Sequence, residues 1–212
     1  HFGIRLLLVA ASAVLGILTF PPITWSGLAA VAWIPLLLAL HGVKPSHASY
    51  LGLFHGVIFY GVTMSWLWDV FRDARHMFFP LILIMSLFTA FFSRGYAVAG
   101  QRYGWGWVTA VFAAVWWVAV EFFRSEIFYL KFPWMTPGVG LGPTWVSPLL
   151  GVCGASFIII LGSALLCQRK KRQMTGAAIL GIMVVSMWLQ KTRGLPETPT
   201  VRVLAVQSEG AD

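Results

Sequence analysis

SPLLGVCGASFIIILGSALLCQRKKR, residues 147–172, decides the class of fold of this chain of 212 residues. Residues 147–167 contain no charged side chain, and they are long enough to cross a bilayer core, which takes about 20 residues of α-helix. Four basic residues follow at once, Arg169 to Arg172, and such a cluster beside an apolar run is typical of the cytoplasmic side of a membrane. The stretch therefore predicts a membrane-spanning helix that ends in the cytoplasm.

The composition of the whole chain indicates a membrane protein. Hydrophobic residues make up 58% of the chain and charged residues only 10%, whereas about 25% of the residues in soluble globular domains are charged. This composition excludes a water-soluble globular domain as the main body, and we predict an α-helical polytopic membrane protein with about seven transmembrane helices. The seven apolar runs are Ile4–Phe20, Thr24–Leu40, Ser49–Trp68, Phe78–Arg102, Trp107–Arg124, Ser147–Cys167 and Thr175–Gln190.

The distribution of charges predicts the direction of insertion. If the seven segments alternate and the cluster at 169–172 is cytoplasmic, all seven acidic residues lie on the outer side, so the formal charge of +8 is a cytoplasmic surplus. The N terminus is then inside and the C terminus outside. Attraction to anionic lipid explains a basic surface of this kind, and we expect no nucleic-acid partner. The basic residues on the cytoplasmic side would be Arg5, Lys44, Arg94, Arg102, Arg169, Lys170, Lys171 and Arg172.

The composition changes after the seventh segment. Residues 194–200 form a polar linker with two prolines, and residues 201–207, VRVLAVQ, alternate like a β-strand. One strand cannot fold alone, and the chain starts at His1 rather than at methionine, so we expect it to be part of a longer protein. We predict a transmembrane domain over 1–193, followed over 194–212 by a linker and the first strand of a soluble domain.

Candidate site residues lie where the fifth segment ends. Glu121 and Arg124 are three residues apart, so in a helix they share one face and can pair near the membrane surface. The stretch 132–142 that follows is broken by prolines and glycines, and irregular backbone is tolerated at membrane depth only where protein or water covers it. The pair either closes the helix as a structural ion pair or braces this loop. The residues that we predict to brace the loop or to line a lipid groove are Glu121, Arg124, Phe132, Pro133, Trp134 and Trp66.

The other polar residues of the apolar runs do not predict a metal site or a catalytic site. Arg94 lies about eight residues, on the order of 12 Å, from the end of its segment, and we favour snorkelling to the surface over contact with a substrate or a pore. Cys153 and Cys167 lack metal-ligand spacing and the histidines are scattered, so no metal site is predicted. No nucleophile with an adjacent base is recognisable, so catalytic residues are expected beyond Asp212.

Several motifs, in order along the chain, resemble the membrane domain of the bacterial apolipoprotein N-acyltransferase family. The most specific part is Glu121-Phe122-Phe123-Arg124 followed by Phe132-Pro133-Trp134. The resemblance covers essentially all 212 residues. The other matching stretches are Phe20-Pro21 with Trp25, residues 61–66 ending at Trp66, Gly151, and residues 203–207, which resemble the first strand of the family's nitrilase-like domain.

The resemblance implies a bundle of seven helices in the bacterial inner membrane, a periplasmic nitrilase-like α/β domain and a closing eighth helix. It implies an acyltransferase of lipoprotein biosynthesis that uses no cofactor. In the family, a Glu-Lys-Cys triad takes an acyl chain from a membrane phospholipid as a cysteine thioester, and passes it to the N-terminal amine of a diacylglyceryl-cysteine lipoprotein. The matched residues include none of this triad, so no catalytic residue is assigned within this chain.

The chain departs from the family pattern in its loop. Lys131 stands where the family has a glycine before Phe-Pro-Trp, and residues 138–141 replace a Gly-Tyr-Ser-Gln-like run, so the loop lacks a polar hydroxyl and an amide. The same membrane fold accompanies a polyprenol-phosphate mannosyltransferase in some bacteria. A non-catalytic membrane scaffold or partner subunit is therefore the alternative function.

Overall fold

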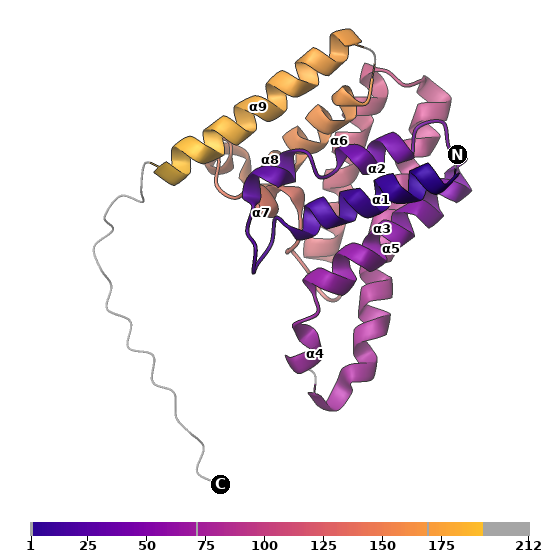
Figure 1. Ribbon diagram of the computed structural model, residues 1–212, viewed down its shortest axis with the longest axis vertical. Helices are drawn as coiled ribbons and strands as arrows, with labels where there is room; N and C mark the ends of the chain where they lie inside the picture. The colour runs from indigo at the N-terminus through magenta and orange to yellow at the C-terminus, as the bar shows by residue number, and fades with distance from the viewer. Residues whose placement is uncertain (1, 71, 169, 193–212) are drawn as a thin grey trace.

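The computed structural model describes residues 2–70, 72–168 and 170–192, and within these ranges the chain is helical and contains no β-strand (Figure 1). The predicted linker and strand over 194–212 lie outside the described residues. In chain order the elements are α1 (Phe2–Ile17), η1 (Ser26–Ala30), α2 (Ile34–Ala39), α3 (Pro45–Thr63), α4 (Leu67–Val70), η2 (Arg72–Met77), α5 (Phe78–Tyr103), α6 (Trp107–Phe122), η3 (Phe123–Ile127), α7 (Pro137–Leu141), α8 (Ser147–Leu166) and α9 (Lys170–Thr192).

Four of the helical segments are long and apolar enough to cross a membrane. They coincide with the last four of the seven predicted segments. Of the first three, α1 and the helical segment Ser26–Ala39, which contains η1 and α2, are apolar but shorter, and α3 is not among the four. Length and composition therefore identify a helical membrane domain with four candidate spans, and seven spans are not shown. The four segments are Ala74–Tyr103, Trp107–Ile127, Ser147–Leu166 and Arg172–Thr192.

The second predicted segment, Thr24–Leu40, is not one continuous helix. It consists of a five-residue 3₁₀ helix, η1, then a turn and the short helix α2. Pro35 lies in the first turn of α2, where the missing N–H costs least, and a proline there prevents α-helical hydrogen bonding from continuing through it. Hydropathy does not reveal this division into two helices, because a proline does not interrupt an apolar run.

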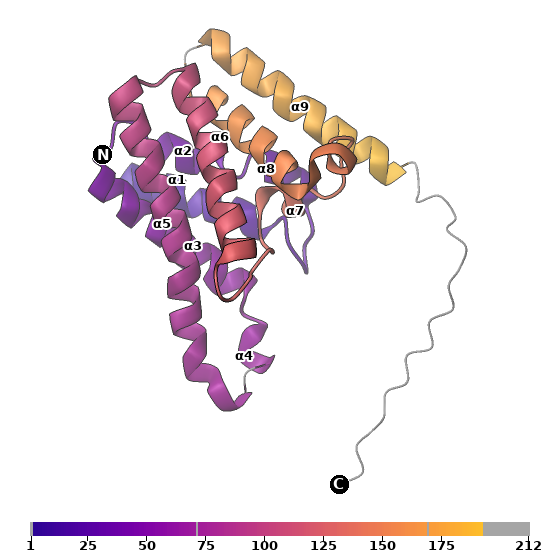
Figure 2. The ribbon, with the colours of Figure 1, turned by 180° about the vertical axis from the view of Figure 1, so that it is seen from behind.

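The helices form two groups that pack side by side. The first group contains α1, α2, α3 and α5, with α2 against α1, and the second contains α6, α8 and α9. The groups meet where α6 lies between α5 and α8 (Figure 2). α9 packs along α8 at the edge of the bundle, and α4 lies at one end of the bundle, near η2 and the start of α5 (Figure 1). The two long helices α5 and α6 are therefore direct neighbours.

Two buried apolar clusters hold these groups together. The larger cluster runs through most of the bundle, where the Trp117 ring lies 4.3 Å from that of Trp33 and 4.8 Å from that of Phe92, centre to centre. The smaller cluster contains Phe59 and Tyr60 of α3 and Met135 of the loop after α6. That loop is therefore packed against the same end of the bundle as the C-terminal end of α3.

Two glycines of α3 allow its backbone to approach α5 closely. A Cβ atom on Gly56 would lie 2.6 Å from Cα of Ser86, and one on Gly52 would lie 2.6 Å from the carbonyl oxygen of Thr89. Small residues at helix contacts are common in membrane proteins because packing, rather than the hydrophobic effect, drives helix association there. The α3–α5 contact therefore depends on these glycines.

We expect Gly56→Ala to lower the free energy of unfolding by about 1–3 kcal/mol, because the added methyl group must push α3 away from α5. Gly61→Ala is the matched control in the same helix, since a Cβ there has no neighbour within 4 Å. The control should be neutral or stabilising by about 0.5–1 kcal/mol. Thermal unfolding of the purified protein in detergent measures both effects, and equal stability of the two variants would contradict the close packing.

Candidate functional site

The chain leaves α6 through a π-helical turn, η3, and then doubles back. The N–H of Phe128 donates to the carbonyl of Phe123 at 2.7 Å, and the N–H of Phe132 donates to the carbonyl of Arg124 at 3.1 Å. Lys131 and Met135 have positive φ angles of 42° and 59°. Such angles cost a non-glycine residue about 1–3 kcal/mol, so tertiary contacts must hold this loop in place.

Arg124 provides the first of these contacts. The residue is 3% exposed, and its guanidinium group donates hydrogen bonds from Nη1 to the hydroxyl of Tyr60 and from Nη2, at 2.9 Å, to the carbonyl of Trp134. Tyr60 belongs to α3 and is itself buried. One side chain therefore ties the end of α6 to α3 and to the Phe-Pro-Trp segment of the loop.

Glu121 provides a second contact, with different partners. The residue is 4% exposed, and its carboxylate accepts hydrogen bonds from Nε1 of Trp117 at 2.8 Å and from Oγ of Ser156 at 3.2 Å. Ser156 in turn accepts the N–H of Gly138 at 3.0 Å. This chain of hydrogen bonds joins α6 to α8 and to α7, the short helix that follows the loop.

The predicted direct pair between Glu121 and Arg124 is not formed in the described structure, because each side chain is bonded to other groups. The spacing rule assumes an α-helix through both residues, but Arg124 lies in the π-helical turn, where the angle between successive side chains differs. The two residues still lie at the same end of α6, and both are buried.

Helix α7 is pressed closely against α8. A Cβ on Gly138 would collide with the carbonyl oxygen of Val152, so only glycine fits at this position. Thr136 caps α7 by accepting the N–H of Val139 at 3.3 Å. Gly151 interrupts α8 with a φ of 65°, a conformation that glycine adopts without strain. Glycines thus allow both the contact and the bend.

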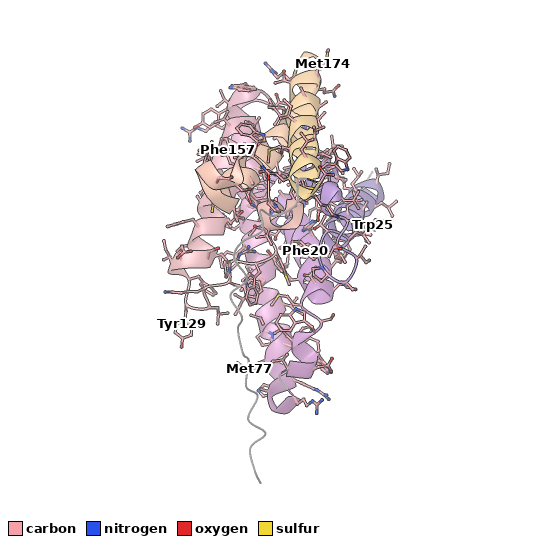
Figure 3. The ribbon with its side chains drawn as sticks, turned by 90° about the vertical axis from the view of Figure 1, so that its left-hand side faces the viewer. Phe20, Trp25, Met77, Tyr129, Phe157 and Met174 are labelled. Carbon is pink, nitrogen blue, oxygen red and sulfur yellow. The ribbon has the colours of Figure 1, made fainter. Side chains whose placement is uncertain are left out.

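The predicted groove-lining residues differ in their exposure. Phe132 is partly buried and its ring lies 5.5 Å from that of Trp134, which is 54% exposed, and Pro133 is exposed. Tyr129, 93% exposed, projects outward from the same loop (Figure 3). The loop therefore presents aromatic and apolar side chains outward while Arg124 holds its backbone.

Trp66 lies between α3 and α4 and is 46% exposed. The neighbouring Met64 and Leu67 are buried in the smaller apolar cluster, which also contains Met135 of the loop. The structure thus places Trp66 beside residues that pack with the loop, but with its own side chain outward. Its role in lipid binding stays a prediction.

Four residues of this site were missed in the sequence: Tyr60, Trp117, Ser156 and Gly138. Trp117 could have been found, because it precedes Glu121 by four residues on the same helix. Gly138 lies within the predicted stretch 132–142, but its contact with Ser156 is not visible in the sequence, and Tyr60 and Ser156 approach the site from distant parts of the chain. Among residues 2–70, 72–168 and 170–192, no group of three or more His, Cys, Asp or Glu side chains could hold a metal ion.

We expect Glu121→Gln to lower the free energy of unfolding by about 1–2 kcal/mol while leaving membrane insertion intact. The NH₂ half of the amide cannot accept the hydrogen bond of Trp117 or of Ser156, so one buried donor loses its partner. Glu126→Gln is the matched control because Glu126 is exposed in the adjoining turn. Thermal unfolding distinguishes the two variants. Identical midpoints would show that the hydrogen bonds of the Glu121 carboxylate do not stabilise the fold.

The sequence is similar to a known family over most of its length. A family model described as the apolipoprotein N-acyltransferase N-terminal domain matches residues 12–165. The chain is also similar to bacterial proteins named apolipoprotein N-acyltransferase. The identity is 30% over 190 residues in Pseudomonas aeruginosa, covering 82% of this chain and 36% of that protein. It is 30% over 194 residues in Azotobacter vinelandii, covering 85% and 37%, and 28% over 140 residues in Nitrosomonas europaea, covering 61% and 28%.

The chain thus spans about a third of the length of the curated relatives that it matches. The family match includes α3, α5, α6 and almost all of α8, and with them the buried residues Tyr60, Glu121, Arg124 and Ser156. The chain therefore belongs to the apolipoprotein N-acyltransferase family, as a representative of its N-terminal membrane domain.

Proposed function

We propose that this chain is the membrane domain of an enzyme that transfers an acyl chain from a phospholipid to the N-terminal amine of diacylglyceryl-cysteine lipoproteins. The relatives' names support an N-acyltransferase, and the helical membrane domain supports a lipid-embedded substrate. In this proposal the bundle crosses the inner membrane seven times, with the N terminus in the cytoplasm. Residues 201–207 then begin a periplasmic nitrilase-like domain.

The observation that carries the proposal is the loop held by two buried charged side chains. Arg124 fixes the backbone of Trp134, and Glu121 fixes α7 through Ser156. The side chains that the loop turns outward are aromatic, and they can contact acyl chains of lipid without exposing its backbone to the hydrocarbon core. Phe132, Pro133 and Trp134 would then form the path by which acyl chains reach the domain that follows.

The chemistry would occur outside this chain. A thiolate attacks the ester carbonyl of the phospholipid, a thioester forms, and the lysophospholipid leaves with its alkoxide oxygen protonated by the acid form of the base that took the thiol proton. The lipoprotein amine then attacks the thioester, an amide forms and the thiol is restored. A thiolate with a nearby base and cation suits both steps.

The test uses the complete protein in phospholipid vesicles, with the label placed either on the acyl chain or on the headgroup. We expect acyl-labelled lipid to leave a protein-bound label that hydroxylamine removes, and headgroup-labelled lipid to leave none. The absence of acyl labelling, or a label that resists hydroxylamine, would contradict the proposal and favour a scaffold.

We expect the double variant Cys153→Ala with Cys167→Ala to keep this label in full. Cys153 lies on the membrane helix α8 and Cys167 follows its last residue, and the Glu121 carboxyl group beside Cys153 is already hydrogen-bonded to Trp117 and Ser156. Mass-spectrometric mapping of the acylated peptide measures this directly. Loss of the label in the double variant would place the reactive thiol in this chain, and would contradict the proposal that the chemistry occurs outside it.

A further inference from the structure

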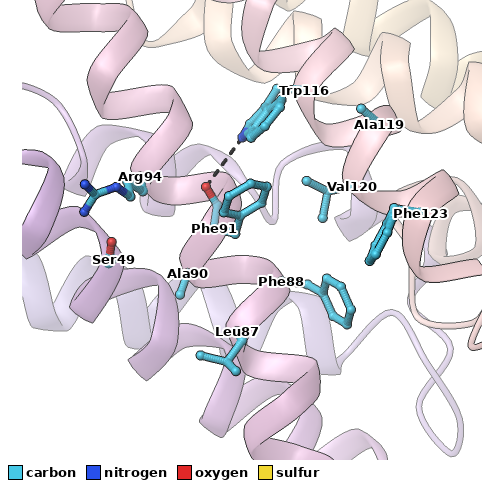
Figure 4. Close-up of a pocket in the computed structure, with 10 residues that line it drawn as sticks. All are labelled: Ser49, Leu87, Phe88, Ala90, Phe91, Arg94, Trp116, Ala119, Val120 and Phe123. Carbon is cyan, nitrogen blue, oxygen red and sulfur yellow. Dashed lines mark hydrogen bonds between the residues drawn. The ribbon is translucent and has the colours of Figure 1, made fainter. Parts of the chain in front are cut away.

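A groove of about 740 Å³ lies between α5 and α6 on the outer surface of the bundle (Figure 4). Its volume is within the range of pockets that bind small molecules, about 300–1,000 Å³. Its lining is apolar except for two polar side chains, and it contains none of the predicted loop residues. The lining residues are Ser49, Leu87, Phe88, Ala90, Phe91, Arg94, Trp116, Ala119, Val120 and Phe123.

Each of the two helices contributes one face to this groove. Phe91 of α5 and Trp116 of α6 lie opposite each other, with ring centres 4.9 Å apart, and Phe88 of α5 faces Phe123 of η3 at 6.3 Å. Ser49 of α3 completes the lining. A Cβ on Gly95 would collide with the indole of Trp116, so this glycine lets the tryptophan lie against α5. The shape of the groove is therefore set by the packing of α5 against α6.

Arg94 lies at one end of the groove, opposite the end formed by Phe88 and Phe123 (Figure 4). Its side chain is exposed, and within the part of the chain that the structure describes it makes no hydrogen bond and no ion pair. It is nine residues from Tyr103 at the end of α5, on the order of 13 Å along the helix axis. A charge at this depth in a membrane is costly unless something compensates it.

No acidic side chain lines the groove. Glu121 lies on α6, next to the lining residue Val120, but its side chain is buried on another side of that helix. There it accepts hydrogen bonds from Trp117 and Ser156. A binding partner must therefore bring the negative charge and an apolar body together. Basic pockets between membrane helices bind lipid headgroups in this manner, and a guanidinium group can hold two phosphate oxygens at once.

We propose that this groove binds a phospholipid, with its phosphate on the guanidinium group of Arg94 and one acyl chain along the groove toward Phe88 and Phe123. The site is separate from the loop of the proposed acyl transfer, and it does not depend on that function. It replaces the snorkelling interpretation of Arg94, because the lipid brings the counter-charge to the side chain.

The test uses the complete protein in phosphatidylcholine vesicles that contain a phosphatidylglycerol with a photoreactive diazirine on its acyl chain. Labelled peptides are located by mass spectrometry. We expect labelling of Phe88, Phe91 or Phe123, reduced about tenfold in Arg94→Gln because one charge-assisted contact is lost. Arg102→Gln is the matched control, as an exposed arginine at the end of the same helix, and it should label normally.

Two further measurements make the outcome decisive. Ala119→Phe should block labelling while leaving Arg94 in place, since Ala119 is exposed in the groove. A diazirine diacylglycerol, which lacks the phosphate, should label the groove about tenfold less than the phospholipid. Equal labelling by the two lipids, unchanged labelling in Arg94→Gln, or crosslinks across the groove to a second copy of the chain would overturn the proposal. Since labelling requires no turnover, an inactive protein that still labels would separate this site from the acyltransferase proposal.

Discussion

Replacing Arg124 with methionine is expected to lower the free energy of unfolding by about 3 kcal/mol, the largest effect of any single substitution at the end of α6. The substitution leaves the hydroxyl of Tyr60 and the carbonyl of Trp134 without their partner. Each buried polar group that loses its hydrogen bond costs about 1–3 kcal/mol, and relief from burying the charge offsets part of the sum. Thermal unfolding measures the change.

The same substitution should also release the loop. Lys131 is exposed in that loop, so trypsin can cleave after it once the backbone is free to move. We expect cleavage after Lys131 to be faster in Arg124→Met than in the wild type, while Arg102→Met, at an exposed position in α5, should leave both stability and cleavage unchanged. Arg124→Met with wild-type unfolding and wild-type cleavage would show that the side chain does not brace the loop.

Gly138→Ala is expected to lower the free energy of unfolding by about 2–3 kcal/mol. The added methyl group meets the carbonyl oxygen of Val152, a backbone atom that cannot rotate away, so α7 must move from α8. That movement also lengthens the hydrogen bond from the Gly138 N–H to Ser156. Thermal unfolding and the rate of tryptic cleavage after Lys131 report the two consequences.

Gly181→Ala is the matched control for this prediction. Gly181 lies within α9, and a Cβ there has no neighbour within 4 Å, so alanine should leave stability unchanged or raise it slightly. If Gly138→Ala behaved like Gly181→Ala, then α7 would not be packed against α8 as described.

The apolar runs predicted most helices well because a hydrophobic run of sufficient length is a local property of the sequence. The predicted segment Phe78–Arg102 became α5, Phe78–Tyr103, and Ser147–Cys167 became α8, Ser147–Leu166. The predicted segment Thr24–Leu40 is divided into η1 and α2, and hydropathy does not reveal this division because one proline changes backbone hydrogen bonding while the run stays apolar. The described helices include four spans by length and composition, so the count of seven stays a prediction.

The candidate site was only half predictable. Two charges at the end of an apolar segment are visible in the sequence, and both proved to be buried. Their partners were not visible, because Tyr60 is 64 residues from Arg124 and Ser156 is 35 residues from Glu121 along the chain. The π-helical turn was also hidden, and it explains why the two charges do not bond to each other.

We propose that this bundle, with its loop held by Arg124, carries lipid for an N-acyltransferase. The most direct measurement is transfer of a labelled acyl chain from phospholipid to a diacylglyceryl-cysteine peptide by the complete protein in vesicles, per folded molecule. We predict transfer by the wild type and a rate about tenfold or more lower in Arg124→Met, because the displaced loop misplaces the acyl chain. No transfer by the wild type, or an equal rate in the folded variant, would contradict the claim.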